Sequence, residues 1–117
     1  MASNIRKHRE AAYLQQSGRC CYCHNPMWLS DPHEFATQHE ITIRQARDLQ
    51  CTAEHLQARR DGGPDKAINI AAACRFCNLK RHERKHPLDP AGFAAFVRRR
   101  QRKGRWNQHL LTPGSWQ

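Results

Sequence analysis

Two closely spaced pairs of cysteines constrain the fold of this chain more than any other feature of its sequence. Cys20 and Cys23 form one C-x-x-C pair, and Cys74 and Cys77 form the other. Each pair brings two sulfur atoms to one side of a tight turn, and two such turns complete a tetrahedral zinc site. Because the pairs lie far apart in the chain, the metal would close a large loop. The sequence therefore predicts a structural Zn²⁺ that joins an N-terminal knuckle to a later helix.

A C-x-x-C pair can also be a redox motif or simply two buried thiols. No βαβ pattern surrounds either pair, which disfavours the redox alternative. Two cysteines are left over. Cys21 could compete for the metal, although Cys20 has the better spacing to Cys23, and Cys51 is expected to be a small buried side chain of the core.

The composition indicates why the fold of such a chain needs a metal site to stabilise it. It has 117 residues, which fits one domain, and only 38% of them are hydrophobic. A core of that size is marginal when it depends on packing alone. No apolar stretch is long enough to cross a bilayer, and residues 1–14 lack the apolar segment of a secretory signal. We therefore expect a cytoplasmic protein without a membrane partner, whose paired cysteines bind metal rather than form disulfides.

Periodicity and turn signals predict a single domain in three parts. These are a basic N-terminal helix over residues 1–17, a zinc-stapled core over 18–86, and a basic C-terminal helix and tail over 87–117. The expected elements are a helix over 4–16, a loop over 28–35 with a turn at Asp31-Pro32, a helix over 41–49 capped by Thr42, a strand over 51–56, a loop over 58–64, a turn or short strand over 67–73, a helix over 74–85 stopped by Pro87, a helix that starts at an Asp89 cap and Pro90, and an irregular tail past Gly104.

An ordered set of polar residues lies between and just after the cysteine pairs. In chain order it contains Glu54-His55, Asp61-Gly62-Gly63, Asn69-Ile70, Asn78 directly after Cys77, and His82. A neutral imidazole can take a proton from water near neutral pH. Asn78 and His82 are four residues apart on the predicted helix, so they share a face, and this spacing suits two ligands of one ion.

In this order of elements, the segment from Gly18 to His82 resembles the HNH endonuclease superfamily. The resemblance implies an α+β fold with a ββα-metal core (the HNH or His-Me finger), here stapled by the four-cysteine zinc site and flanked by helices. It also implies a metal-dependent endonuclease that hydrolyses DNA phosphodiesters and leaves 5′-phosphate and 3′-hydroxyl ends. His55 would then be the general base, and Asn69 would hold the loop between the two strands and so orient His55.

The same resemblance implies a second metal site. Glu54, Asn78 and His82 would hold a catalytic Mg²⁺, Mn²⁺ or other divalent ion, and an amide such as that of Asn78 can ligate a hard cation. Adjacent side chains on an extended strand point to opposite faces. A local distortion is therefore implied at Glu54 and His55, because both would serve one site.

The basic composition predicts a nucleic-acid partner. Lys and Arg outnumber Asp and Glu by 20 to 10, and the formal net charge is +10. Such a domain binds phosphate backbones, acidic membranes or acidic proteins, and charge alone does not choose among them. Together with the motifs it favours nucleic acid, and double-stranded DNA is the expected substrate. An alternative for the basic end of the last helix is a solvated tail. The residues expected to contact DNA are Arg59, Arg60, Arg75, Lys80, Arg81, Arg84, Arg98, Arg99, Arg100, Arg102 and Lys103.

Two other functions remain open from the sequence. A zinc-finger module that binds DNA without catalysis would explain the charge and the cysteines, but not the arrangement of Glu54, His55 and Asn78. An accessory factor that nicks DNA only within a phage packaging or restriction machine is the other alternative. A homodimer is compatible with either function.

Overall fold

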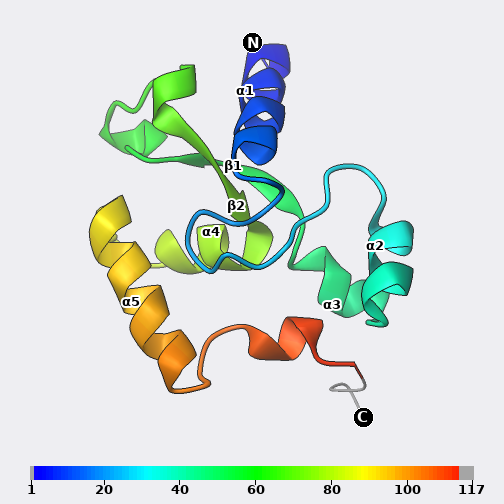
Figure 1. Cartoon of the computed structure of the whole chain (residues 1–117). Coiled ribbons are helices and arrows are strands. Elements are labelled where there is room, and N and C mark those ends of the chain that lie inside the picture. The colour runs from blue at the N-terminus through cyan, green and yellow to red at the C-terminus, as the bar shows by residue number, and fades with distance from the viewer. Residues whose placement is uncertain (1, 114–117) are drawn as a thin grey trace.

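The computed structural model describes residues 2–113, with side chains from residue 4 onward. It shows an α+β fold around a two-stranded antiparallel sheet (Figure 1). The elements in chain order are α1 (Ala2–Gln15), α2 (Pro32–His39), α3 (Ile43–Arg47), β1 (Cys51–His55), the 3₁₀ helices η1 (Arg59–Asp61) and η2 (Ala67–Asn69), β2 (Ile70–Cys74), α4 (Arg75–Arg81), α5 (Pro90–Arg102) and the 3₁₀ helix η3 (Gln108–Leu111). Within the described part of the chain, no helix is long and apolar enough to traverse a bilayer.

Within the described residues, neither outer edge of the sheet pairs with a further strand, but side chains bond to both edges. β1 and β2 pair without interruption from Cys51 opposite Cys74 to His55 opposite Ile70. On the outer edge of β2, the Gln16 side chain exchanges two hydrogen bonds with the backbone of Ala72, at 2.8 and 3.0 Å. α4 follows β2 directly, and its side chains bond the free carbonyl groups of β1. A short sheet with capped edges is protected from pairing with another chain.

The helix boundaries show which local signals decide the fold. Thr42 begins α3 with a capping box to Gln45, and Asp89 begins α5 with Pro90 in the first turn, so both predicted caps are confirmed. The loop predicted over 28–35 is partly wrong. Asp31 accepts a hydrogen bond from the Glu34 N–H and starts α2 at Pro32, because an Asp-Pro pair can open a helix as well as a turn.

Two further boundaries correct the sequence prediction. α4 ends at Arg81, about one turn before the predicted end at residue 85. The tail past Gly104 is not irregular, because η3 forms there and Leu110 and Asn107 are fully buried. In Figure 1, the segment after α5 returns beneath α4 toward α3, which is how it reaches the core.

The core is small and built around the cysteines. Its largest fully buried apolar side chains are Leu49, Val97 and Leu110, and Tyr22, Met27, Phe35 and Phe93 are nearly as buried. All four cysteines of the two C-x-x-C pairs belong to the same cluster. A metal bound there would stand at the meeting point of the N-terminal knuckle, the sheet and α4.

Candidate functional site

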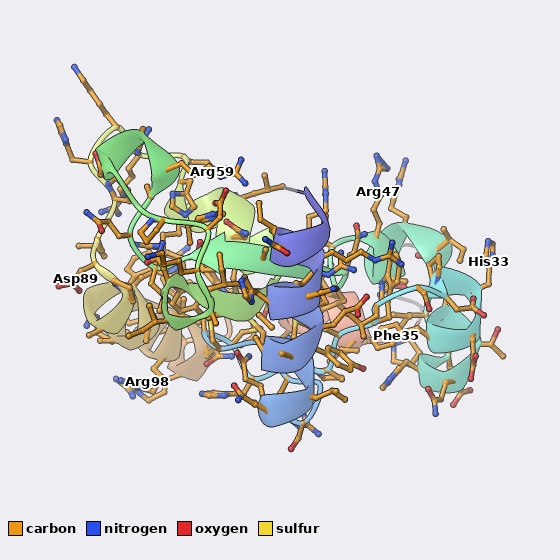
Figure 2. The ribbon with its side chains drawn as sticks, turned by 90° about the horizontal axis from the view of Figure 1, so that it is seen from above. His33, Phe35, Arg47, Arg59, Asp89 and Arg98 are labelled. Atoms are coloured by element: carbon orange, nitrogen blue, oxygen red, sulfur yellow. The ribbon has the colours of Figure 1, made fainter. Side chains whose placement is uncertain are left out.

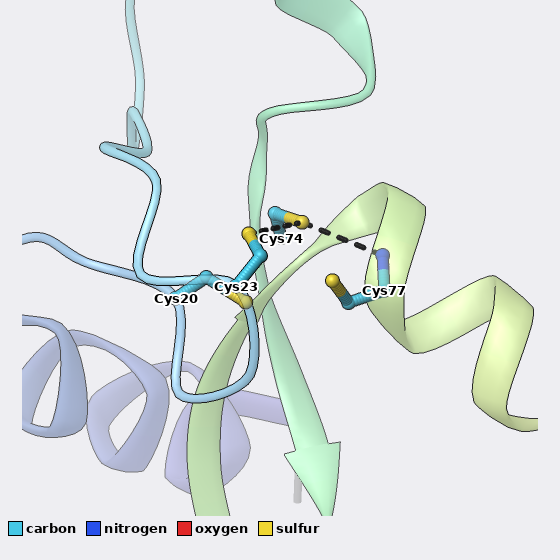
Figure 3. A group of neighbouring side chains, drawn as sticks. All are labelled: Cys20, Cys23, Cys74 and Cys77. Atoms are coloured by element: carbon cyan, nitrogen blue, oxygen red, sulfur yellow. Dashed lines mark hydrogen bonds between the residues drawn. The ribbon is translucent and has the colours of Figure 1, made fainter. Parts of the chain in front are cut away.

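The paired cysteines converge into one buried cluster that could hold a metal such as zinc. The sulfur atoms of Cys20, Cys23, Cys74 and Cys77 all lie within 4.8 Å of one another. Figure 3 shows the knuckle loop meeting the end of β2 and the start of α4. A zinc–sulfur bond of about 2.3 Å separates tetrahedral ligands by about 3.8 Å. The Cys23 and Cys74 sulfurs are 3.8 Å apart, which matches that spacing, so the predicted four-cysteine cluster could hold a metal such as zinc.

N–H groups point at several of these sulfurs, while hydrogen bonds among the thiols lower the pKa of Cys20 and raise the pKa values of Cys74 and Cys77. The backbone N–H of Tyr22 points to Cys20 Sγ at 3.4 Å, and the indole N–H of Trp106 points to Cys77 Sγ at 3.3 Å. Hydrogen bonds from neighbouring thiols, Cys21 first, lower the pKa of Cys20. Burial raises the pKa of the Cys51 thiol to about 11, so that side chain is an inert core residue, as predicted.

Glu54 is completely buried and has a protein partner for each oxygen. Tyr22 donates its hydroxyl to Oε2 at 2.8 Å, and Arg81 donates Nη1 to the same oxygen at 2.9 Å. Oε1 lies 2.9 Å from His82 Nε2. Because the charge of a buried carboxylate needs such partners, this network fixes the orientation of Glu54.

The structure contradicts the sequence prediction for Arg81. The charge pattern predicts that it contacts DNA, but it is 4% exposed. Besides Glu54, its guanidinium donates to the backbone carbonyls of His55, Leu56 and Leu88 at 3.0 to 3.2 Å. Its donors are therefore used inside the protein, and Arg81 holds the end of β1 rather than a phosphate.

Asn78 and His82 project from α4 and its C-terminal cap toward the free edge of β1. Asn78 Nδ2 donates to Thr52 Oγ1 at 3.0 Å and to the Ala53 carbonyl at 3.3 Å. These bonds hold the amide so that its nitrogen faces the strand. Among residues 2–113, no hydrogen bond to Asn78 Oδ1 is present, which leaves this oxygen available to a cation.

His55 is held by a carboxylate that the sequence analysis did not single out. His55 Nε2 lies 2.7 Å from Asp65 Oδ1, and Arg59 Nε donates to the same oxygen at 3.2 Å. A carboxylate only accepts, so this contact is a hydrogen bond when the proton is on Nε2, although Arg59 Nε also lies 3.3 Å from that nitrogen. The hydrogen bond to His55, more than the nearby charge of Arg59, lowers the pKa of Asp65. In a neutral ring with that tautomer, Nδ1 is the acceptor atom.

Asn69 occupies the position expected of a residue that holds the loop. Its side-chain Oδ1 accepts from the Gln57 N–H at 2.8 Å, and its Nδ2 donates to the carbonyls of Gln57 and Pro64 at 3.0 Å. These bonds join the two ends of the segment that carries Arg59 and runs up to Asp65. Its role in orienting His55 stays a prediction.

The candidate side chains border one open pocket of about 290 Å³. Its lining residues are Ala53, Glu54, His55, Ala58, Arg59, Arg60, Asn78 and His82. The register of β1 is continuous, so the distortion expected at Glu54 and His55 is absent from the strand pairing. The pocket instead lies at the free edge of β1, where side chains from both faces of a strand can border the same space.

The remaining basic residues do not form one surface. Arg75 pairs with Asp48, Lys80 lies 3.6 Å from Glu83, and Arg60 donates to the carbonyls of Arg84 and Lys85. Figure 2 places Arg59 and Arg98 on opposite sides of the molecule. The exposed run at the end of α5 contains Arg98, Arg99, Arg100, Arg102 and Lys103, so it is separate from the pocket at His55.

The chain was compared with family models, with curated proteins and with solved structures, and none of them matches. Sequence reasoning missed Tyr22 and Asp65. It also missed the structural role of Arg81. Tyr22 stands inside the cysteine knuckle and Asp65 follows Gly62-Gly63-Pro64, but nothing in either pattern reveals a partner far away in the chain.

Proposed function

We propose that this chain is a DNA endonuclease of the HNH kind, with β1, β2 and α4 as its ββα-metal core. The observation that carries the proposal is the single pocket at the free edge of β1. Glu54, His55, Asn78 and His82 come from two separate segments of the chain, and all four border that pocket. Each of them has the chemistry that hydrolysis of a phosphodiester needs.

The donor set suits a divalent cation. In an octahedral site with bonds of about 2.1 Å, neighbouring ligands are about 3.0 Å apart. Glu54 Oε1 and His82 Nε2 are 2.9 Å apart, so one ion could take both atoms as neighbouring ligands if it replaced the proton of the hydrogen bond between them. Asn78 Oδ1 supplies a third. When bound, Mg²⁺ or Mn²⁺ would stabilise the charge that develops on the phosphate and on the departing 3′ oxygen.

The chain itself supplies the base. With its Nε2 proton held by Asp65, His55 presents Nδ1 as a proton acceptor, in the way that a carboxylate fixes the tautomer of other catalytic histidines. Nδ1 takes a proton from water as the water oxygen bonds to phosphorus. The bond from phosphorus to the 3′ oxygen breaks, and that oxygen gains a proton from solvent. The products are a 5′-phosphate and a 3′-hydroxyl.

Double-stranded DNA is the proposed substrate. Arg59 and Arg60 line the pocket itself, beside the proposed base. The net charge of +10 favours a polyanion, and phosphate contacts make binding fall steeply with salt.

The test is nicking of a supercoiled plasmid by the zinc-loaded protein with added Mg²⁺ or Mn²⁺. His55→Ala should lower the rate by about 10²-fold or more, which is the usual contribution of a general base. His86→Ala is the matched control, since His86 is exposed and lies outside the pocket. Equal cleavage by wild type and His55→Ala would refute the mechanism.

One observation favours a second function, a zinc-finger module that binds DNA without cleaving it. The carboxylate of Glu54 already has protein partners on both oxygens, so its burial does not require a cation. Under this function, wild type binds DNA and no divalent metal supports cleavage. An accessory nicking subunit would instead cleave only when combined with its native phage packaging or restriction partners, which co-purification from the host would reveal.

A further inference from the structure

A second pocket, of about 330 Å³, lies between α4 and α5, away from the one at His55. Four aromatic rings contribute to its lining: Phe76, Phe93, Phe96 and Trp106. Phe76 and Trp106 meet edge to face at 5.2 Å between centroids, and Phe96 and Trp106 do so at 5.7 Å. Each of these rings has a flat apolar face, and a planar group can pack against such a face.

Two of the four rings lie next to the cysteine cluster. Trp106 donates its indole N–H to Cys77 Sγ, and Phe76 is the neighbour of Cys77 in α4. Phe76, Phe96 and Trp106 are only half-buried, although each packs against another ring. Part of the aromatic surface is therefore still reachable from solvent.

Cations surround the same rings. Lys80 Nζ lies over the Phe76 ring at 5.5 Å, and the guanidinium groups of Arg84 and Arg100 lie over the Phe96 ring at 5.5 and 5.9 Å. Arg105 also lines the pocket, and Glu83 is its single acidic residue among those described. The exposed charges in the lining are therefore predominantly positive. They favour a ligand that carries an anionic group beside a flat one.

We propose that this pocket binds an unstacked nucleotide of a single-stranded DNA segment, with the base among the rings and its phosphates on Lys80, Arg84 and Arg100. Alternating aromatic surface and positive charge is the arrangement that proteins use for single strands. A base stacked in a duplex offers no free face. An acidic peptide would satisfy the cations, but it has no flat group that would use the rings. The inference adds a contact to the proposed nuclease function and does not depend on His55 chemistry.

The experiment measures binding of a short oligothymidylate to the zinc-loaded His55→Ala protein without added divalent metal. The readout is the NMR signal of the Trp106 indole N–H, assigned with Trp106→Phe. We expect a saturable shift of that signal with the single strand, and weaker binding of a blunt duplex of equal length. An acidic peptide of similar charge should leave the signal unmoved.

Two double variants distinguish binding in this pocket from nonspecific electrostatic attraction. Arg84→Ala/Arg100→Ala and Arg98→Ala/Arg99→Ala remove the same charge, but only the first pair lines the pocket. We expect the first to weaken binding at least fivefold more than the second. Phe96→Leu keeps apolar volume without a ring, and the lost stacking should weaken binding about tenfold, with zinc content and urea unfolding as checks of the fold.

Four results would refute the proposal that this pocket binds a single-stranded nucleotide. These are equal losses in the two arginine pairs, an unmoved Trp106 signal, a preference for the duplex, and equal binding of the acidic peptide. The nuclease proposal fails separately, because it is tested by plasmid nicking with and without His55. Binding of oligothymidylate by a protein that never cleaves DNA would support the pocket and refute the nuclease.

Discussion

Replacing Arg81 with methionine tests whether the buried ion pair organises the core. The side chains of Arg81 and Glu54 are 4% and 1% exposed, so solvent cannot compensate for the lost partner. Removing one member of such a pair typically costs about 3–5 kcal/mol, because the other charge stays buried. At about 2.1 cal/mol/K per residue, the unfolding entropy of 117 residues is about 0.25 kcal/mol/K. We therefore expect the melting temperature of Arg81→Met to fall by about 12–20 °C.

The assay is urea and thermal unfolding of zinc-loaded proteins at one fixed zinc concentration. Arg99→Met is the matched control, because Arg99 is exposed on α5, and it should change stability by no more than about 0.5 kcal/mol. Glu54→Gln combined with Arg81→Met removes the stranded charge and should recover part of the loss. A cost for Arg81→Met as small as that of Arg99→Met would refute the reasoning.

Removing zinc with a strong chelator, or changing Cys77 to serine, should abolish cooperative thermal unfolding followed by circular dichroism, because zinc contributes about 10 kcal/mol or more to folding; unchanged unfolding after verified metal loss would contradict this. Gly63→Ala should lower the free energy of unfolding in urea by more than about 2 kcal/mol, since a Cβ there would stand 1.7 Å from the Gln57 carbonyl oxygen. Gly62→Ala, with open space around a φ of +87°, should cost about 1 kcal/mol, and equal losses would be the opposing outcome. Because burial raises its pKa to about 11, Cys51 should resist maleimide at pH 8 until urea unfolds the chain, as mass spectrometry of its peptide would show.

The sequence was sufficient where a signal is local. The spacing within each C-x-x-C pair predicted the metal cluster, and the Thr42 and Asp89 caps predicted where two helices begin. A cap works through the N–H groups of its own helix, so it can be identified without the rest of the fold. Asp31 failed as a predictor only because Asp-Pro opens turns and helices alike.

The rest depends on contacts between distant segments. Nothing near Arg81 distinguishes it from Lys80 or Arg84, which are exposed, because burial is decided by what α4 packs against. The same is true of Asp65, which lies ten residues from its partner His55, on a loop whose ends are joined by the Asn69 side chain. Charge patterns in sequence therefore overstate the number of arginines that face a ligand.

Besides its effect on stability, the cysteine knuckle helps to position Glu54. Tyr22 stands between two thiols of the knuckle, and its hydroxyl reaches Glu54 at 2.8 Å. Cys74 both supplies a sulfur and caps α4, the helix that presents Asn78 and His82. Two segments that carry these cysteines, the knuckle and α4, therefore both contribute side chains around Glu54. In a chain that is 38% hydrophobic, packing alone is a weak way to fix a buried carboxylate. A metal bound by the four sulfurs would hold these segments in place with a much smaller core, and the contacts of Tyr22 and α4 connect the cysteine cluster to the pocket as one structural unit.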